Sequence, residues 1–374
     1  MTEEALHLVV ERSALHKALA HCQGVVERRN TVPILAHVLL EARNNTLKIT
    51  ATDLELTLIE TVPAHIKKEG KTTVSAHLLF DVVRKLNEGA DIELKTTEEE
   101  DFLQLQSGKS AYNFPCLPSI EFPALLEENH VCTFKIPAPD FLRLIDKTHF
   151  SMSTQETRYH LNGIFFHTTE DGFLKAVTTD GLRLATAQVA LPSKILMMPQ
   201  VIMARKTIQE IRKLIDGVTG EITIALSDTQ VRFDVGSSVL ISRLIEGKFP
   251  DYEQVIPFGN DKVLETDVKA FAEAVDRVSL MSTDKLRPVK IQITGDTMLL
   301  SAHSSEIGNA VEELDIKYEG DPIEFGFNAR FVLDVTQQIA SPTLQFLIGD
   351  ETQAIIAKDA VDDASLYVLM PMRV

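Results

Sequence analysis

The chain of 374 residues repeats one pattern of helix and strand signals at an interval of about 125–130 residues. A long internal period requires several copies of one folded unit, which constrains the architecture more than any other feature of the sequence. Three segments with apolar residues at helical spacing begin the three repeats. They are ERSALHKALAHCQGVV from Glu11, PAPDFLRLIDKTHFSMS from Pro137 and DVKAFAEAVDRVSLMST from Asp267.

A second helix is predicted about 55–65 residues after each first helix, in the segments that begin at Ser75, Ala204 and Phe327. We expect about 16 residues in each first helix and about 12 in each second. The segments between and after the helices alternate apolar with polar residues across short turns, which predicts antiparallel strands. The sequence therefore predicts an α+β chain of three repeated domains, with limits at 1–126, 127–256 and 257–374.

A Thr-Asp pair occurs at equivalent places in two repeats, in TATDLEL around Asp53 and TTDGLRLA around Asp180. Asp-Gly between two apolar runs favours a hairpin turn, because both residues tolerate positive φ. Paired carboxylates could instead serve a two-metal catalytic centre. The third repeat has HSSE at this place, without an aligned aspartate, so repeated turn chemistry explains the pattern better. The catalytic alternative remains open at this stage.

Charge is segregated along the chain, whose formal net charge is −17. The windows 12–29, 77–86, 140–149, 205–216, 267–287 and 328–340, around the predicted helices, hold 17 basic and 11 acidic residues. The rest of the chain holds 20 basic and 43 acidic residues. Helix propensity alone would not favour Lys and Arg over Glu. The pattern therefore indicates a basic helical surface for a polyanion, with solvated surface charge as the alternative.

Motifs of the common catalytic and cofactor sites are absent from the sequence. It contains no GxxxxGK[ST] loop, GxGxxG turn, HExxH helix or GxSxG elbow. Cys22, Cys116 and Cys132 match no CxxC spacing, so we expect reduced thiols and no metal site or cofactor. The absence of a long apolar run and of a signal-peptide pattern favours a cytoplasmic protein that does not bind membranes.

At this point the residues resemble a known family over essentially the whole chain. TVPILAHVLLEA, TATDLELT, RYHLNGIFF, TTDGLRLA, GKFPDY, FGFNARFVLDV and YVLMPMRV are similar to segments of the bacterial DNA polymerase III beta subunit, the replicative sliding clamp. The resemblance implies a head-to-tail homodimer of three-domain chains, closed as a ring around duplex DNA. It implies a processivity factor without intrinsic catalysis, which tethers the replicative polymerase. Other implied partners are the clamp loader, repair polymerases, mismatch repair proteins and ligase.

The resemblance also implies a hydrophobic pocket between domains 2 and 3 that takes a short peptide from these partners. Its residues here would be Leu161, Thr179, Gly181, Leu182, Arg183, Leu184, Pro250, Val255, Phe331, Val368, Met370, Pro371 and Met372. Leu182, Gln254 and Phe331 depart from the family's usual residues and remove polar groups, so the preferred peptide is expected to differ. Because the pocket is mostly apolar, we expect Arg183 to contribute only modestly to peptide binding.

For DNA and for the second protomer, the resemblance implies two further sets of residues. The DNA contacts would be Arg29, Gln155, Tyr159, His160, Arg205, Lys206, Lys285 and Arg287. The dimer contact would join Lys109 and Tyr112 of one protomer to Leu280 and Met281 of the other. His77 and Leu78 stand where the family often has basic residues, so the first domain's contact with DNA would be weaker, or pH-dependent through His77.

Overall fold

The structure is a computed structural model that describes residues 5–28, 31–97, 101–124, 128–191, 198–282 and 287–372. Two α-helices fall in each predicted repeat, which confirms the repeat. They are α1 (Arg12–Val25), α2 (Ala76–Lys85), α3 (Ala138–Thr148), α4 (Arg205–Ile215), α5 (Val268–Ser279) and α6 (Ala329–Thr336). No helix of these described segments is long and apolar enough to cross a membrane.

The helices are shorter than the sequence predicts. The first helices have 14, 11 and 12 residues, and the second have 10, 11 and 8. Helix α1 ends at Val25 because Val26 is already extended, and the Val26 N–H donates to the carbonyl of Cys22 to close the last turn. Apolar periodicity therefore locates each helix but overestimates its length, because apolar residues can continue at helical spacing beyond the last residue with helical backbone angles.

The chain forms two compact units, each of which combines residues of two repeats. The first holds Met1–Pro139 and Lys206–Leu244, and the second holds Asp140–Arg205 and Ile245–Val374. This division crosses the repeats because, in each unit, one large sheet is built from the strands of two neighbouring repeats.

The first unit contains a five-stranded and an eight-stranded antiparallel sheet. The five-stranded sheet has the order β5 (His65–Lys68), β1 (His7–Glu11), β7 (Asp91–Thr96), β8 (Phe102–Ser107) and β9 (Ser110–Pro115). The eight-stranded sheet has the order β10 (Cys132–Pro137), β15 (Glu221–Leu226), β16 (Gln230–Val235), β17 (Ser238–Arg243), β4 (Leu56–Pro63), β3 (Thr46–Thr52), β2 (His37–Arg43) and β6 (Gly70–Ser75). The repeats meet where β4 pairs with β17, with Leu240 opposite Leu58.

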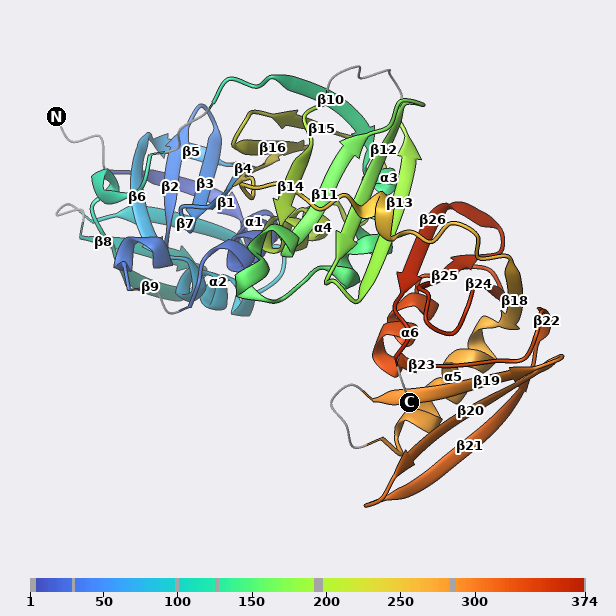
Figure 1. Ribbon diagram of the computed structural model, residues 1–374. Coiled ribbons are helices and arrows are strands. Elements are labelled where there is room, and N and C mark those ends of the chain that lie inside the picture. Colours follow the sequence, from blue (N-terminus) through green and yellow to red (C-terminus); the bar gives the residue numbers. More distant parts are fainter. Residues whose placement is uncertain are drawn as a thin grey trace. The chain divides into compact units, whose positions relative to one another are not determined.

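The second unit contains a nine-stranded and a four-stranded sheet. The nine-stranded sheet has the order β14 (Val201–Ala204), β11 (Gly163–Thr168), β12 (Phe173–Thr179), β13 (Arg183–Ala190), β26 (Asp362–Leu369), β25 (Ile355–Asp359), β24 (Thr343–Ile348), β18 (Lys262–Asp267) and β22 (Lys317–Glu319). The four-stranded sheet has the order β21 (Gly308–Asp315), β20 (Thr297–Ser304), β19 (Pro288–Thr294) and β23 (Ile323–Asn328). Here the repeats meet where β13 pairs with β26, the green and red strands that lie side by side in Figure 1.

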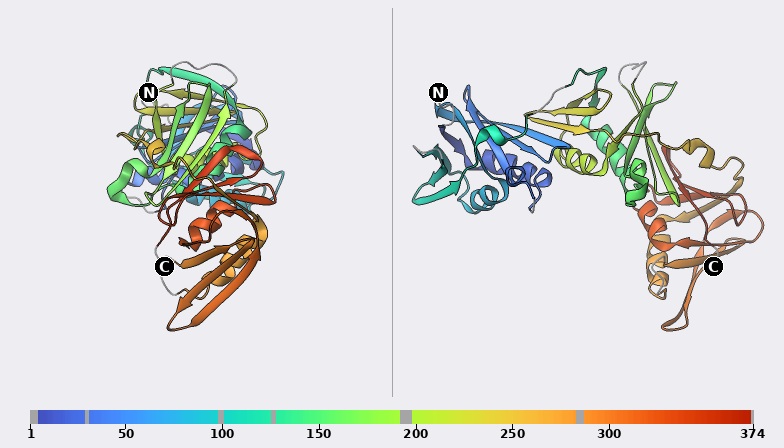
Figure 2. Two further views of the ribbon diagram at one scale, coloured as in Figure 1. Left: turned by 45° about the vertical axis from the view of Figure 1, so that its right-hand side comes forward. Right: turned by 60° about the vertical axis from the view of Figure 1, so that its left-hand side comes forward.

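Alternating burial along the strands places the cores between sheets and helices. Strand β20 buries Met298, Leu300 and Ala302 and turns the intervening side chains outward. Helix α5 packs its apolar face, including Phe271, against this sheet and against α6. The β20–β21 hairpin is the long ribbon at the edge of the second unit, which both views of Figure 2 show.

Each of the four sheets of the described chain ends in edge strands with a partner on one side only, and β9 and β21 are two of these edge strands. Strand β9 pairs with β8 and ends the five-stranded sheet, and β21 pairs with β20 and ends the four-stranded sheet. Each therefore presents a row of backbone N–H and C=O groups that can pair with another strand.

We predict an acid-sensitive contribution to the stability of the five-stranded sheet from Glu93 on β7. Its Oε1 lies 2.6 Å from Lys67 Nζ on β5 and 2.6 Å from His7 Nε2 on β1. The hydrogen bond from Lys67, with that from His7, lowers the pKa of Glu93 from 4.5 to about 2. A pKa depressed in the folded state stabilises the fold above the unfolded value and ceases to do so as pH falls through the folded value.

The Glu93→Gln variant should therefore melt at a lower temperature than wild type near neutral pH. The difference should shrink as pH falls from about 4.5 to about 2, as followed by circular dichroism. A difference that stays constant down to the lower pH would contradict this assignment.

Candidate functional site

The Thr-Asp segment of the second repeat is a turn between β12 and β13, as predicted. Asp180 Oδ1 accepts the backbone N–H groups of Leu182 at 2.9 Å and Arg183 at 3.1 Å. Thr179 Oγ1 accepts the N–H of Gly181 at 3.0 Å and donates to the carbonyl of Arg183 at 2.7 Å. Gly181 has φ 92°, a conformation that glycine adopts without steric cost. The aspartate therefore shapes the turn.

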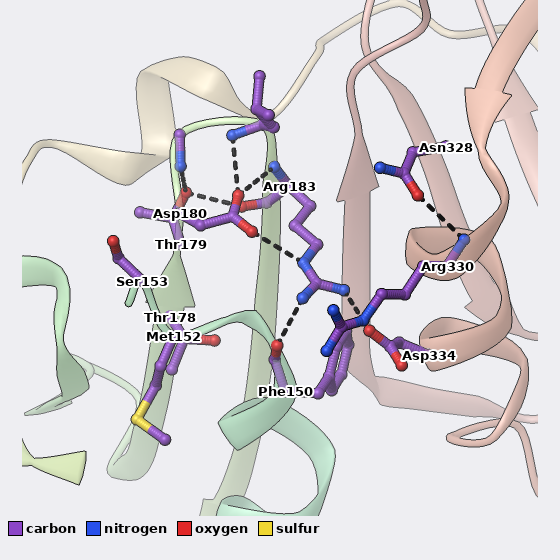
Figure 3. A network of polar contacts seen from close by, with 12 residues as sticks. Phe150, Met152, Ser153, Thr178, Thr179, Asp180, Arg183, Asn328, Arg330 and Asp334 are labelled. Carbon is purple, nitrogen blue, oxygen red and sulfur yellow. Dashed lines mark hydrogen bonds and ion pairs between the residues drawn. The ribbon is translucent and has the colours of Figure 1, made fainter. Parts of the chain in front are cut away.

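Arg183 joins this turn to the third repeat. Its side chain is only 8% exposed, and its Nε donates to Asp180 Oδ2 at 3.0 Å. Its Nη1 lies 2.6 Å from Asp334 Oδ2 on α6, and its Nη2 lies 2.7 Å from the carbonyl of Phe150 (Figure 3). The guanidinium also stacks over the ring of Phe331, 4.3 Å from its centroid. One buried cation thus holds a strand of one repeat against a helix of the next.

The first repeat builds the same turn from Thr52 and Asp53. Asp53 Oδ1 accepts the N–H groups of Glu55 at 3.0 Å and Leu56 at 2.7 Å. Its other oxygen lies 2.5 Å from Lys206 Nζ on α4, which belongs to the next repeat. In the third repeat Ser304 Oγ accepts the N–H of Glu306 at 3.3 Å, with no aspartate beside it.

These contacts explain the repeated aspartates by turn geometry and cation pairing. Within the described segments, no group of three or more His, Cys, Asp and Glu side chains could hold a metal ion. Cys22, Cys116 and Cys132 are free thiols, and burial raises the pKa of each.

A pocket of about 390 Å³ lies where this turn meets the end of β26. The register Leu184↔Val368 brings buried apolar side chains of the two repeats together beneath it. Met370 N–H donates to the carbonyl of Leu182 at 3.1 Å, which fixes the chain at the rim. The lining residues are Arg158, His160, Leu161, Thr179, Gly181, Leu182, Arg183, Leu184, Pro250, Val255, Val368 and Met370.

Most of the predicted pocket residues line this cavity, but three do not. Phe331 is not among the lining residues, and its ring lies against the guanidinium of Arg183. Met372 instead forms a backbone bridge with Gly326 on β23. Pro371 is also absent from the lining.

Two basic residues of the pocket wall were not predicted there. Arg158 was missed, and His160 was assigned to DNA. Both lie on the short 3₁₀ segment Glu156–Leu161, whose inner side chain, Leu161, belongs to the apolar floor. Arg158 Nη1 would lie 2.6 Å from a methyl group placed on Gly181, so the guanidinium covers the turn.

The predicted DNA contacts divide into exposed and internally engaged side chains. Gln155, Tyr159 and Arg287 are exposed. Arg205 Nη2 donates to the carbonyls of Met152 at 3.0 Å and Ser153 at 2.8 Å, and burial lowers its pKa. Arg29 and Lys285 lie outside the described residues.

Two of the predicted basic contacts also make hydrogen bonds within the protein. Arg205 caps carbonyls after α3, and Lys206 is held by Asp53 and by the carbonyl of Val25 at 3.0 Å. These bonds engage only Nη2 of Arg205 and leave one N–H of the Lys206 ammonium group, so both residues stay predictions as DNA contacts. His77 is likewise held, with Nε2 2.9 Å from the carbonyl of Val26 and Nδ1 facing Gln23 Oε1. It joins α2 to the end of α1.

The predicted dimer residues lie on or near two edge strands, β9 and β21. Lys109 is in the β8–β9 turn, and the exposed Tyr112 is on β9. Leu280 and Met281 directly follow α5, whose Arg277 pairs with Glu312 on β21 at 2.7 Å.

We predict that Arg183 is a structural anchor, a role in stability that is separate from its expected modest contribution to peptide binding. Removing it leaves Asp180 and Asp334 without their shared cation in a largely buried place. Arg183→Ala should lower the free energy of unfolding of the second unit by about 3 kcal/mol. Urea unfolding measures this change.

Arg158→Ala is the matched control, because that guanidinium is exposed and no hydrogen bond joins it to another described residue. It should change the stability by less than about 0.5 kcal/mol. Equal losses in the two variants would contradict the anchoring role.

The amino-acid sequence of the chain matches models of a known protein family. Models of the DNA polymerase III beta subunit match the chain in three consecutive parts. The N-terminal domain matches residues 6–126, the central domain residues 135–251 and the C-terminal domain residues 253–373.

Relatives match along their full length. The beta sliding clamp of Caulobacter vibrioides is 43% identical over 372 residues, which cover 99% of this chain and all of that one. The beta sliding clamp of Escherichia coli is 34% identical and covers 98% of this chain and 100% of its own.

Solved structures agree. A Caulobacter crescentus beta sliding clamp superposes with a TM-score of 0.95 at 43% identity, over 99% of this chain and 100% of that one. A Bartonella birtlesii clamp bound to griselimycin has a TM-score of 0.96 at 41% identity, with the same coverage. The chain therefore belongs to the bacterial DNA polymerase III beta subunit family, the beta sliding clamps, which are non-catalytic accessory subunits of a DNA polymerase.

Proposed function

We propose that two copies of this chain close head to tail into a ring that encircles duplex DNA and tethers the replicative polymerase. The pattern of strand pairing carries this proposal. In the first repeat, β2, β3 and β4 are consecutive strands that follow the first helix. The third of them, β4, pairs with β17, the last strand of the second repeat. In the same way β13 pairs with β26.

The same rule, applied once more, pairs β21 with β9. Both are edge strands of the described chain, each with a strand partner on one side only. Pairing β21 of one protomer with β9 of its partner would extend the sheets without a break and remove both exposed edges. Because each protomer offers one edge of each kind, the contact is heterologous and closes when the rotation completes a ring. Lys109, Tyr112, Leu280 and Met281 would flank this contact.

The segregated charge supports a weak, sequence-independent grip on the duplex. Basic helices within an acidic protein attract the phosphate backbone without reading bases. Retention then depends on the closed ring, and the phosphate contacts can remain loose enough for sliding. Of the implied contacts, Gln155, Tyr159 and Arg287 are exposed in the described chain. We propose them as DNA contacts together with Arg29, His160, Arg205, Lys206 and Lys285.

The pocket beside Arg183 is the proposed docking site for partner proteins. Its floor and walls are mostly apolar, and it is large enough for a few side chains of a linear peptide. We propose that the polymerase, the clamp loader and repair proteins, including repair polymerases, mismatch repair factors and ligase, bind here in turn. We propose that the protein works in the cytoplasm, as three domains at 1–126, 127–256 and 257–374.

The dimer can be tested at Leu280, whose side chain is 63% exposed in the chain. Small-angle scattering of wild type should give a mass near twice 41.6 kDa and a distance distribution with a central hole. Leu280→Asp should give a folded monomer, because a charge would be buried at the β9–β21 contact.

Phe258→Asp is the control, since Phe258 is 88% exposed in the same unit and belongs to neither β9 nor β21. It should remain dimeric. A wild-type protein that stays at 41.6 kDa at micromolar concentration would refute the ring.

The docking site can be tested with labelled griselimycin, which is bound in the Bartonella clamp. Leu182→Asp should weaken its binding at least about tenfold, because a carboxylate replaces an apolar contact at the rim. Fluorescence polarisation measures the affinity, and the dimer mass should not change.

Val361→Asp, in the β25–β26 turn and outside the pocket lining, is the matched control. It should bind griselimycin as wild type does. If the affinity at Leu182→Asp were unchanged, the pocket would not be the docking site.

A further inference from the structure

Met370 holds an unusual place among the methionines of this chain. It lines the pocket and is 41% exposed. Its backbone N–H donates to the carbonyl of Leu182, which fixes this exposed residue at the rim. A flexible, apolar thioether suits a pocket that accepts several partners.

The other described methionines are better protected. Met152, Met198, Met203 and Met298 are buried, while Met281 and Met372 are half-buried. Met1 and Met197 lie outside the described residues. Oxidation of methionine follows its exposure, so we expect Met370, the most exposed of the described methionines, to react first.

We propose that Met370 is a modification site for hydroperoxides, and that its sulfoxide closes the docking pocket. The Met370 sulfur donates an electron pair to the terminal oxygen of the hydroperoxide, and an S–O bond forms as the O–O bond breaks. The proton of that oxygen passes to the second oxygen, which leaves as water from hydrogen peroxide or as an alcohol from an alkyl hydroperoxide. The sulfur is oxidised by two electrons and the peroxide is reduced by two. This inference rests on the proposed function of the pocket.

The pocket walls determine the effect of that one oxygen atom. The sulfoxide is polar and chiral, whereas the neighbouring lining is Leu182, Leu184 and Val368. Burying the new oxygen under an apolar ligand without a donor is unfavourable. The exposed guanidinium of Arg158 lines the same cavity, and the described structure records no hydrogen bond from it to another residue. Arg158 can donate to the sulfoxide and hold it across the opening.

Occupancy and oxidation should therefore exclude each other. A ligand in the pocket covers the Met370 sulfur, and a sulfoxide at Met370 weakens the ligand. Peroxide would then act on free clamps more than on clamps that are engaged with a partner. Methionine sulfoxide reductases reverse the modification, so the closure is reversible.

The test uses the full-length protein, hydrogen peroxide and labelled griselimycin. Peptide mass spectrometry over a peroxide time course should find Met370 oxidised before Met281 and Met372, and more slowly when griselimycin is bound. Binding of griselimycin to the oxidised protein should be weaker by about tenfold, and treatment with the reductases should restore it.

Two variants separate this site from other oxidation. Met370→Leu is measured before and after peroxide, and its affinity, whatever the starting value, should no longer change. Met281→Leu should lose affinity on oxidation as wild type does. The proposal would be overturned if wild-type protein with fully oxidised Met370 bound griselimycin with unchanged affinity. It would also be overturned if Met281 or Met372 were oxidised before Met370.

Failure of the pocket itself can be distinguished from these results. If the reduced wild-type protein does not bind griselimycin, the proposed docking function fails and this inference fails with it. If the reduced protein binds and Met370 oxidation leaves that binding intact, the docking function stands and the modification site alone is refuted.

Discussion

Each unit depends on an aspartate whose two carboxylate oxygens make different contacts. One oxygen of Asp53 or Asp180 accepts the backbone N–H groups of its own turn. The other pairs with a cation, which is Lys206 in the first unit and Arg183 in the second. The geometry of the turn and the joint between two repeats are thereby coupled, because neither oxygen can be given up without exposing a buried donor.

The two joints share a backbone arrangement but differ in chemistry, which accounts for the apolar pocket beside the turn of the second. Arg243 N–H donates to the carbonyl of Glu55 at 2.9 Å, as Met370 N–H does to Leu182. The first joint thus has a charged pair, 3.6 Å apart, where the second has Leu182 and Met370. Charged side chains remain solvated and close this surface to apolar peptides, whereas the second joint leaves apolar area to bury.

Patterns within short segments were predictable, and contacts between distant segments were not. Helical periodicity found all six helices, and the Thr-Asp turns followed from local backbone chemistry. The pocket was found because its walls lie in motifs that resemble a family. Asp334 and Phe150 could not be assigned to Arg183, since they are 151 and 33 residues away. The same limit made Lys206 look free, because nothing local shows that it faces Asp53.

Neither the aspartate nor the cation that joins two repeats within each unit has a counterpart at the proposed joint between protomers. In the third repeat Ser305 stands where Asp53 and Asp180 stand in the others. Lys206 is the second residue after β14, and the second residue after β6 is His77, which is bound to the end of its own α1. The proposed β9–β21 contact would therefore rely on strand pairing and on apolar contacts such as Leu280. In a ring built this way, opening at the joint between chains leaves both compact units intact.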